Sequence, residues 1–343
     1  MEARQQFSIV LPVRNGGEHV KECVHSILQQ SYRGFNLLIL ENFSTDGTFE
    51  WLQSLNDERI EIIPADRPLS LEDNWSRISE IKRNEFLTII GHDDLLDPDY
   101  LEVMSALIKK HPEATLYQTH FRFIDASGNF LRHCLPMGEV QQVHEFVGNL
   151  FMMTLDSMGS GYMMRSTDFD AVGGFSRYHN LIFGDSELWV RLTAQGYLAT
   201  EHAECFSYRE HSSASAGTGV TQYQSSLFKF LLFLDKEAQT NQKLNEVISR
   251  YCASYLDCMC EGLIYRGLRS NRAKDRKKAS DIANEFDELK KKLMPAEKYS
   301  ATRPPRIQMA ILIDKWFIGR SVFKMTLAMK EAMKSLLTCE FMR

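Results

Sequence analysis

The segment FSIVLPVRNGGEHVKECVHSILQQSYRGFNLLIL, residues 7–40, decides the fold because it holds a complete strand–helix–strand unit. Its two ends, 7–11 and 35–40, are continuous apolar runs of strand length, and Pro12 follows the first run. Two strands joined by a helix predict a parallel pair. Between them, apolar side chains recur at the spacing of one helical face: Val20, Cys23, Val24, Ile27 and Leu28.

The same alternation continues beyond this unit. Strands that are apolar throughout and alternate with helices predict an α/β fold with a Rossmann-like, mainly parallel sheet and helices on both faces. In such a sheet, ligands bind beyond the carboxyl ends of the strands. The further strands are predicted at 60–63, 86–90 and 114–119, and the further helices at 51–55, 75–81 and 101–108.

The composition is that of a globular protein without a membrane-spanning segment. The chain has 343 residues, of which 44% are hydrophobic and 25% charged. Its net charge of -5 gives no argument for a nucleic-acid partner. Seven cysteines without a C-x-x-C pair favour free thiols. Because no apolar run reaches about 18 residues, we expect a cytoplasmic protein.

Polar loops follow three of the predicted strands. They are PVRNGG at 12–17, ENFSTDGT at 41–48 and GHDD at 91–94. Taken singly, each loop has a structural interpretation as a turn or a helix cap. Because the carboxyl ends of parallel strands meet at one edge, we expect the three loops to form one site.

The last of these loops contains two adjacent carboxylates, Asp93 and Asp94. Two like charges side by side disfavour one another's ionisation unless solvent or a cation relieves them. Carboxylate oxygens are ligands that Mg²⁺ and Mn²⁺ prefer. The pair therefore indicates either a solvated helix entry or a metal site.

These stretches resemble the family 2 glycosyltransferases of bacterial surface-polysaccharide synthesis, whose fold is GT-A. That family has P-x-x-N after the first strand and D-D/N-G-S-T-D-G-T after the second. The resemblance extends from residue 7 to residue 215 with the motifs in the right order. Its later parts are LSLEDNWSRI at 69–78, GHDDLLDPDYLE at 91–102, GGFSRYHNLIFGDSELWVRLTAQG at 173–196 and YREHSSAS at 208–215.

The resemblance implies a nucleotide pocket. In it, Glu41 takes the place of the acid that hydrogen-bonds the base. A carboxylate there accepts an imide N–H, which favours uracil or thymine and hence a UDP- or dTDP-linked sugar. The implied nucleotide-binding residues are Pro12, Val13, Asn15, Glu41, Asn74 and Asp93.

The resemblance also implies a divalent metal, Mn²⁺ or Mg²⁺. Asp93 matches the usual direct ligand and Asp94 follows it, but Gly91 stands where the first acid of the D-x-D motif is expected. His211 matches a third metal ligand, and a lone surface histidine is the alternative interpretation.

The residue implied for catalysis is Asp185, as the general base of an inverting displacement. The family's neighbouring glutamate is Gly184 here, and Glu187 is the rival carboxylate one helical turn away. The implied acceptor is a hydroxyl of a glycan or lipid-linked molecule. Because Gly91 and Gly184 replace acids, a non-catalytic GT-A partner or scaffold of another transferase is the alternative function. A sugar-nucleotide nucleotidyltransferase is disfavoured, since no glycine-rich loop bearing Arg and Lys follows the first strand.

The resemblance implies a GT-A domain at 1–220. Beyond it, helical periodicity predicts a helical appendage at 221–300 and basic amphipathic C-terminal helices at 301–343. From Arg303 on, eight basic residues oppose three acidic ones. We therefore expect the last part to dock on an anionic membrane, on the inner face of the cell membrane. Packing on the transferase domain or on a second subunit of a homo-oligomer is the alternative. The predicted apolar stripe is Val322, Met325, Met329, Met333 and Leu336.

Overall fold

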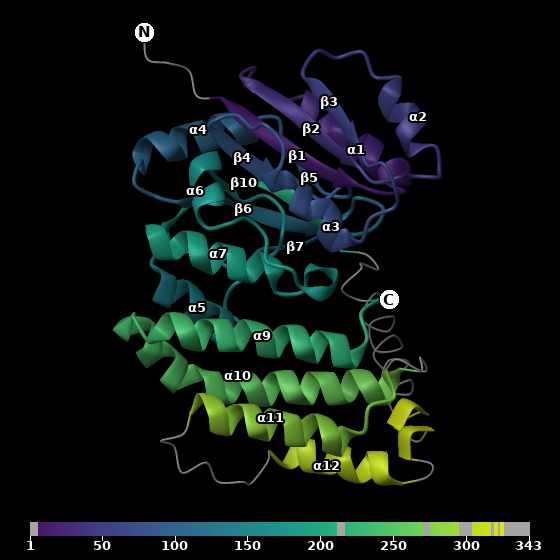
Figure 1. Cartoon of the computed structure of the whole chain (residues 1–343), viewed down its shortest axis with the longest axis vertical. Helices are drawn as coiled ribbons and strands as arrows, with labels where there is room; N and C mark the ends of the chain where they lie inside the picture. The colour runs from purple at the N-terminus through teal and green to yellow at the C-terminus, as the bar shows by residue number, and fades with distance from the viewer. Residues whose placement is uncertain are drawn as a thin grey trace, which may run out of the picture. The chain divides into compact units, whose positions relative to one another are not determined.

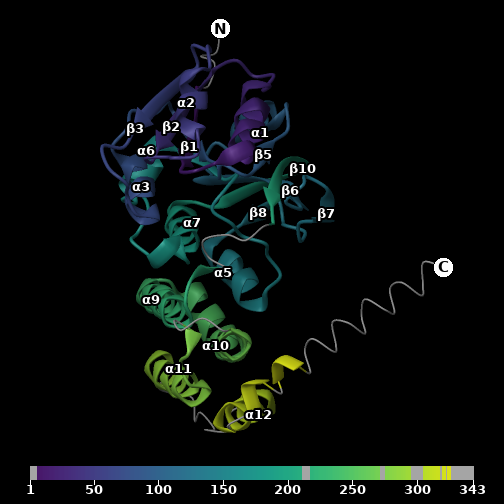
Figure 2. The ribbon, with the colours of Figure 1, turned by 90° about the vertical axis from the view of Figure 1, so that its right-hand side faces the viewer.

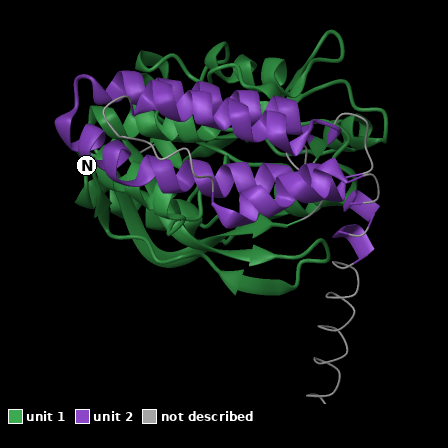
Figure 3. Ribbon diagram, turned by 90° about the horizontal axis from the view of Figure 1, so that it is seen from below, with its two compact units in different colours: residues 1–217 green, residues 218–343 purple. Residues whose placement is uncertain are grey.

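The computed structural model describes residues 6–210, 217–270, 275–294, 304–316, 319–321 and 323–325. The chain divides into two compact units, Met1–Gly217 and Thr218–Arg343, which are coloured separately in Figure 3. The boundaries predicted at residues 220 and 300 for the three functional parts stay a prediction.

The first unit is built on a sheet with the strand order β3-β2-β1-β4-β9-β6-β10-β5 (Figure 1). The four strands predicted first are parallel neighbours in it. Every residue of β1 is buried, as the continuous apolar pattern indicated. These strands are β1 (Phe7–Val13), β2 (Phe35–Glu41), β3 (Ile60–Pro64) and β4 (Phe86–Ile89).

The other half of the sheet is mixed. β9 (Met163–Arg165) lies antiparallel between β4 and β6, while β6 (Leu116–Ile124) and β10 (Leu198–Arg209) are parallel to each other. The predicted α/β fold with a mainly parallel sheet is confirmed, with these antiparallel additions. The remaining short strands are β5 (Leu95–Leu96), β7 (Phe130–His133) and β8 (Val140–Gln141).

The order in which strands are added to the sheet reverses at β1. The path runs from β1 outward through β2 to β3, and then returns to place β4 on the other side of β1. Right-handed crossovers therefore place α1 and α2 on one face and α3 on the other (Figures 1 and 2). The loops after β1 and β4 therefore separate toward opposite faces of the sheet. Open sheets bind ligands at such a point. These helices are α1 (Gly17–Leu28), α2 (Thr48–Gln53) and α3 (Leu71–Ser76).

Later helices of this unit follow the strands of the mixed half. α4 contacts β10 and β6, and α7 also contacts β6. Their bounds are α4 (Tyr100–Lys110), α5 (Val143–Met152), α6 (Ser166–Ala171), the 3₁₀ turn η2 (His179–Leu181) and α7 (Gly184–Gln195).

The second unit is helical, which confirms the predicted C-terminal helical region. Its buried contacts include a hydrogen-bonded ion pair between Lys290 and Asp257. No helix among the described residues is both long enough and apolar enough to cross a membrane. The helices are α9 (Val220–Ala238), α10 (Gln242–Arg269), α11 (Ala279–Leu293) and α12 (Pro305–Lys315).

Candidate active site

The loops that follow β1 and β2 are bound to each other. Asn15 has a left-handed backbone, with φ of 52°, and its Oδ1 accepts a hydrogen bond from the Thr45 N–H at 2.8 Å. The Asn15 N–H in turn donates to Ser44 Oγ at 2.9 Å. Pro12 and Val13 are buried residues of β1 itself. Asn15 therefore shapes the edge of the sheet, and its contact with a nucleotide stays a prediction.

Glu41 ends β2 with a buried carboxylate. Its Oε1 accepts the Ser44 N–H at 2.7 Å, and its Oε2 accepts the Phe43 N–H at 3.1 Å. Two backbone donors fix the orientation of the carboxylate. Each oxygen retains a second lone pair, so the group can still accept an N–H from a ligand.

Asn74 and Arg77 hold the carboxyl end of β2 in place. Asn74 is buried on α3, where its Nδ2 donates to the Leu40 carbonyl at 3.2 Å and its Oδ1 accepts from Arg77 Nη1 at 2.9 Å. Arg77 also donates to the Glu41 carbonyl at 3.2 Å. The direct nucleotide contact predicted for Asn74 stays a prediction, while these contacts position Glu41. Arg77 was not singled out from the sequence, although the N-W-x-R motif contains it.

The two adjacent aspartates have different surroundings. Asp94 is buried, and its Oδ1 accepts the Arg209 N–H at 2.9 Å. Burial, and then the charge of Asp93, raise the pKa of Asp94 well above its ordinary value, and a hydrogen bond from Ser160 opposes them. Asp93 is only half-buried. Of the pair, Asp93 is therefore the carboxylate that a ligand reaches from solvent.

Gly91 leaves the space that the Asp93 carboxylate occupies. A Cβ atom on Gly91 would lie 2.7 Å from Asp93 Oδ1 and 3.1 Å from Asp94 Oδ2. Both distances are shorter than ordinary van der Waals contact, so a side chain here would displace at least one carboxylate. The Asp93 carboxylate therefore lies against the place where the side chain of the missing first acid would begin.

Arg209 ties this loop to the rest of the sheet. Its side chain is fully buried, and its Nε donates to the Asp93 carbonyl at 2.7 Å. Its Nη2 forms an ion pair with Glu22 of α1 at 2.6 Å. Arg209 was not singled out from the sequence, because its partner Glu22 lies 187 positions earlier.

Asp185 lies in the first turn of α7, immediately after Gly184. Its Oδ1 accepts the Ser186 N–H at 2.7 Å, while its Oδ2 lies 3.8 Å from the place of a Cβ on Gly159. The Trp75 ring borders the same place at 3.7 Å. Desolvation raises the pKa of Asp185 to about 6. A carboxylate with this pKa is ionised at neutral pH and basic enough to accept a proton.

Tyr208 is a half-buried residue of β10. Burial raises its pKa to about 12, with further contributions from the charges of Asp94, Asp93 and Asp185. The charges of all three carboxylates therefore raise the pKa of the Tyr208 phenol. The Gly91 N–H, in the loop of the aspartate pair, donates to Ser160 Oγ at 2.8 Å, and the neighbouring Gly159 lies against Asp185. Asp93, Asp94 and Asp185 therefore lie in one region, and Tyr208 is a residue of that region that sequence analysis missed.

Glu187, the alternative to Asp185 as the general base, is held by neighbouring side chains. It is buried, and its carboxylate accepts hydrogen bonds from the hydroxyls of Ser176 and Tyr178. It also forms an ion pair with Arg191 at 3.4 Å. These partners occupy the carboxylate and tie α7 to the segment that precedes it.

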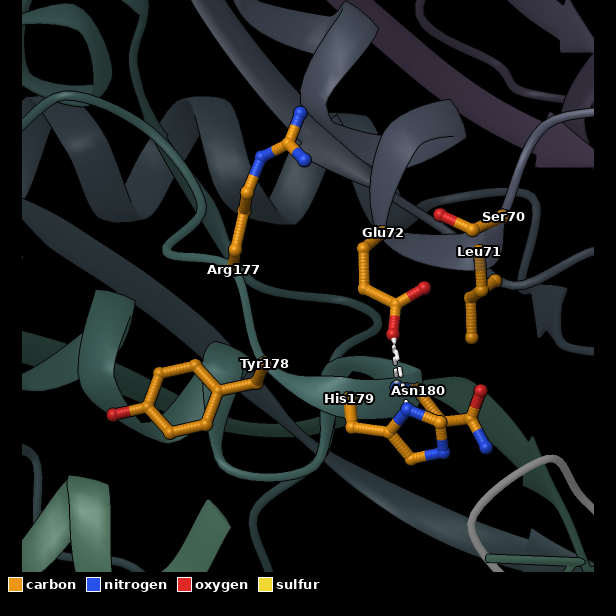
Figure 4. A pocket seen from close by; sticks show the side chains of 7 residues that line it. All are labelled: Ser70, Leu71, Glu72, Arg177, Tyr178, His179 and Asn180. Atoms are coloured by element: carbon orange, nitrogen blue, oxygen red, sulfur yellow. Dashed lines mark hydrogen bonds and ion pairs between the residues drawn. The ribbon is translucent and has the colours of Figure 1, made fainter. Parts of the chain in front are cut away.

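A pocket opens between the start of α3 and the segment before α7 (Figure 4). Its volume is about 450 Å³. Glu72 accepts a hydrogen bond from the Asn180 N–H, and Arg177 pairs with Asp73 at 2.9 Å. The lining residues are Ser70, Leu71, Glu72, Arg177, Tyr178, His179 and Asn180.

The metal ligands can be tested only in part. His211 lies outside the described residues. Within the part of the chain that the structure describes, no group of three His, Cys, Asp or Glu side chains is arranged to hold a metal. Asp93 and Asp94 supply carboxylate oxygens, the ligand type that a hard divalent ion prefers, and their binding of such an ion stays a prediction.

The fold places this first unit among GT-A proteins. The structure aligns with S. aureus TarS residues 1–349 in complex with UDP-GlcNAc, with a TM-score of 0.63 and 11% identity, over 90% of this chain and 84% of that one. It also aligns with the mannosyltransferase PcManGT from Pyrobaculum calidifontis in complex with GDP-Man and Mn²⁺, with a TM-score of 0.51 and 12% identity, over 94% and 88% of the two chains. At these identities the likeness shows the fold.

The sequence then gives the family. Residues 8–167 match the model of glycosyl transferase family 2 and are a domain of that family, which confirms the resemblance drawn from the motifs. The chain is 22% identical over 126 residues to glycosyltransferase GlyG of Streptococcus pneumoniae, covering 36% of this chain but only 42% of GlyG. It is also 22% identical over 252 residues to an uncharacterized glycosyltransferase of Rickettsia typhi, covering 70% of this chain and 78% of that protein.

The geometry at Gly91 gives a first prediction. We expect Gly91→Asp, which restores the acid of the D-x-D motif, to weaken Mn²⁺-dependent nucleotide binding because the new Cβ displaces the Asp93 carboxylate. Overpacking of this kind costs about 1–3 kcal/mol of unfolding free energy, measurable by denaturant titration. Gly138→Ala is the control, because its Cβ would meet only the Val140 carbonyl oxygen, at 3.8 Å. Tighter nucleotide binding by Gly91→Asp would contradict the prediction.

Proposed function

We propose that the chain is an inverting glycosyltransferase that moves a sugar from a UDP- or dTDP-linked donor to a hydroxyl of a glycan or lipid-linked acceptor in cell-surface polysaccharide synthesis. The proposal rests chiefly on the gathering of Asp93, Asp94 and Asp185 around Gly159 and Ser160, at the sheet edge where the Glu41 loop also lies. The complexes of TarS with UDP-GlcNAc and of PcManGT with GDP-Man support a nucleotide-sugar donor.

The chemistry follows from what each group can do. The acceptor oxygen attacks the anomeric carbon while Asp185 takes the hydroxyl proton, so a new glycosidic C–O bond forms on the opposite face of the sugar. The bond from the anomeric carbon to the diphosphate breaks, and the nucleoside diphosphate leaves with the electron pair. Asp93 and Asp94 would hold Mn²⁺ or Mg²⁺, which supplies charge neutralisation for the leaving diphosphate.

The pocket before α7 is proposed as the entry for the acceptor. It ends at Asn180, a few residues before Asp185, and offers the Glu72 carboxylate, the Asn180 amide and the half-exposed His179 ring. Groups of this kind recognise hydroxyl-rich ligands through several directed hydrogen bonds. Glu72 also holds the Asn180 backbone, whose φ of 50° is left-handed.

A non-catalytic partner of another transferase is the alternative, and the replacement of acids by Gly91 and Gly184 favours it. The two functions make different demands on Asp185. Burial raises the pKa of Asp185 to about 6, a value that suits a general base, and this supports the catalytic role.

The role of Asp185 gives a second prediction. We expect Asp185→Asn to lower kcat by roughly two orders of magnitude or more and to leave UDP affinity within about twofold. For the unchanged protein, kcat/KM should fall about tenfold per pH unit below a pKa of about 6, because the base must be ionised. Turnover of a panel of UDP- and dTDP-sugars, followed by nucleotide release, measures both.

Stability separates this role from a structural one. Because burial raises the pKa of Asp185, its contribution to folding is present at acid pH and is lost as the pH rises through about 6. Asp185→Asn should therefore be at least as heat-stable as the unchanged protein at neutral pH. Glu187→Gln is the matched comparison, and we expect it to lower the Tm since Ser176, Tyr178 and Arg191 lose a charged partner. The assignment fails if Glu187→Gln loses turnover without losing stability.

A third prediction concerns the metal. We expect Asp93→Asn to abolish the increase in Tm that UDP with Mn²⁺ produces, because the half-buried carboxylate that faces the ligand is gone. The Tm without ligand should change little. Glu113→Gln, which also removes one negative charge, at an exposed residue after α4, serves as a control for net charge. Full turnover in excess chelator would exclude a metal requirement.

Peripheral binding to an anionic membrane is part of the proposal. Most of the predicted stripe lies outside the described residues, but α12 presents another. Met309, Leu312 and Trp316 follow the spacing of one helical face and are 60%, 59% and 70% exposed. Arg306 and Lys315 are exposed on the same helix. An apolar face beside basic side chains, with a tryptophan at its end, is suited to the headgroup region of anionic lipid.

A fourth prediction tests this surface. We expect the full chain to sediment with anionic liposomes at low salt, and Leu312→Gln with Trp316→Ser to lose most of that binding with an unchanged Tm, because both side chains are exposed. The control is Phe130→Ser, at a 54% exposed aromatic on β7. If the double variant still binds the liposomes, α12 is not the contact. If the variant changes the oligomeric state instead, the face packs on protein.

A further inference from the structure

Phe43 combines two properties that folding alone disfavours. Its backbone is left-handed, with φ of 57°, and its side chain is 47% exposed. A bulky residue in this conformation is strained, because its Cβ approaches the backbone too closely. In the D-D/N-G-S pattern that this loop resembles, the same position is Gly, which takes the conformation without strain.

The surrounding contacts hold Phe43 in this conformation. Its N–H donates to Glu41 Oε2 at 3.1 Å. Next to it, the Asn42 side chain pairs twice with the backbone of Leu69, donating to its carbonyl at 3.1 Å and accepting from its N–H at 2.8 Å. Arg14 donates to the same carbonyl at 3.4 Å. The loop is therefore a rigid frame, and strain in such a frame points to a use for the side chain.

Packing does not account for the ring. About half of its surface is exposed, and the ring stacks on no other aromatic ring among the described residues. Met153, Leu181 and Phe183 also combine a bulky side chain with positive φ. What sets Phe43 apart from them is its place in the loop that the Glu41 carboxylate holds. Phe43 lies two residues after Glu41, whose carboxylate oxygens each keep a second lone pair that can accept an N–H.

We infer that the Phe43 ring is a stacking face for the pyrimidine base of the donor nucleotide. This inference rests on the proposed function and specifies its nucleotide site. Glu41 would accept the imide N–H at the edge of the base, while the aromatic ring covers one face of it. Edge and face contacts together favour a planar base that carries an N–H, as uracil and thymine do. The contact replaces water on both rings and needs no movement of the held loop.

The test uses changes that separate strain from stacking. Phe43→Gly removes both, so it should raise the Tm of the free protein while weakening uridine and UDP binding roughly tenfold. Phe43→Leu keeps the strain and loses the aromatic face, so it should weaken binding without raising the Tm. Phe43→Tyr should bind within about twofold of the unchanged protein. Calorimetric titration of the full chain with UDP, uridine and inorganic pyrophosphate, each with Mn²⁺, measures these affinities.

The three ligands separate the outcomes. Under the proposal, Phe43→Gly loses affinity for uridine and UDP but not for pyrophosphate, which has no base. Phe130→Leu, at an exposed ring on β7, should change none of them. If the unchanged protein binds UDP and Phe43→Gly binds uridine equally well, the stacking role is overturned and the transferase proposal stands. If the unchanged protein binds no pyrimidine nucleotide, both are overturned.

Discussion

The buried guanidinium of Arg209 is the constraint on which the sheet edge depends. A cation without solvent must find partners within the protein, since leaving it unpaired costs several kcal/mol. Arg209 finds them in the Asp93 carbonyl, in the Ala126 carbonyl at 3.2 Å and in Glu22. These groups belong to the loop after β4, the turn after β6 and helix α1. If any of these three elements moved away, the buried guanidinium would lose a partner. The loop that carries the two aspartates therefore keeps its position before any ligand binds.

The sequence predicts the parallel half of the sheet well because its strands are buried on both faces. The apolar runs at 7–11 and 35–40 lie within β1 and β2, and their register joins Val13 to Glu41 at the site edge. No such pattern marks β10. Exposed and charged residues interrupt it, and its pairing with β6 shifts between Glu201 and Phe206. A strand with this irregularity has neither a continuous apolar run nor a clean alternation.

The residues of the candidate site also differ in how well the sequence predicts them. Glu41, Asp93 and Asp185 could be proposed from the sequence because motifs and strand ends mark their positions. Arg77, Tyr208 and Arg209 also lie within quoted motifs, but their roles could not be read from them, since those roles arise from partners that are close only after folding. A local pattern carries no signal for a contact such as Arg209 with Glu22, which closes a loop of 187 residues. Sequence analysis thus finds groups that face a ligand more readily than groups that position them.

Two departures from the family pattern act in opposite directions at this edge. At Gly91 the chain has lost a side chain, and the Asp93 carboxylate fills the space. At Phe43 it has gained one where the backbone conformation suits glycine. Each departure violates a local preference, and local preferences are most often violated where function requires it. Both positions lie in loops that border β1 at its carboxyl end, so the differences from the family pattern fall on the surface that would contact a nucleotide rather than on the core beneath it.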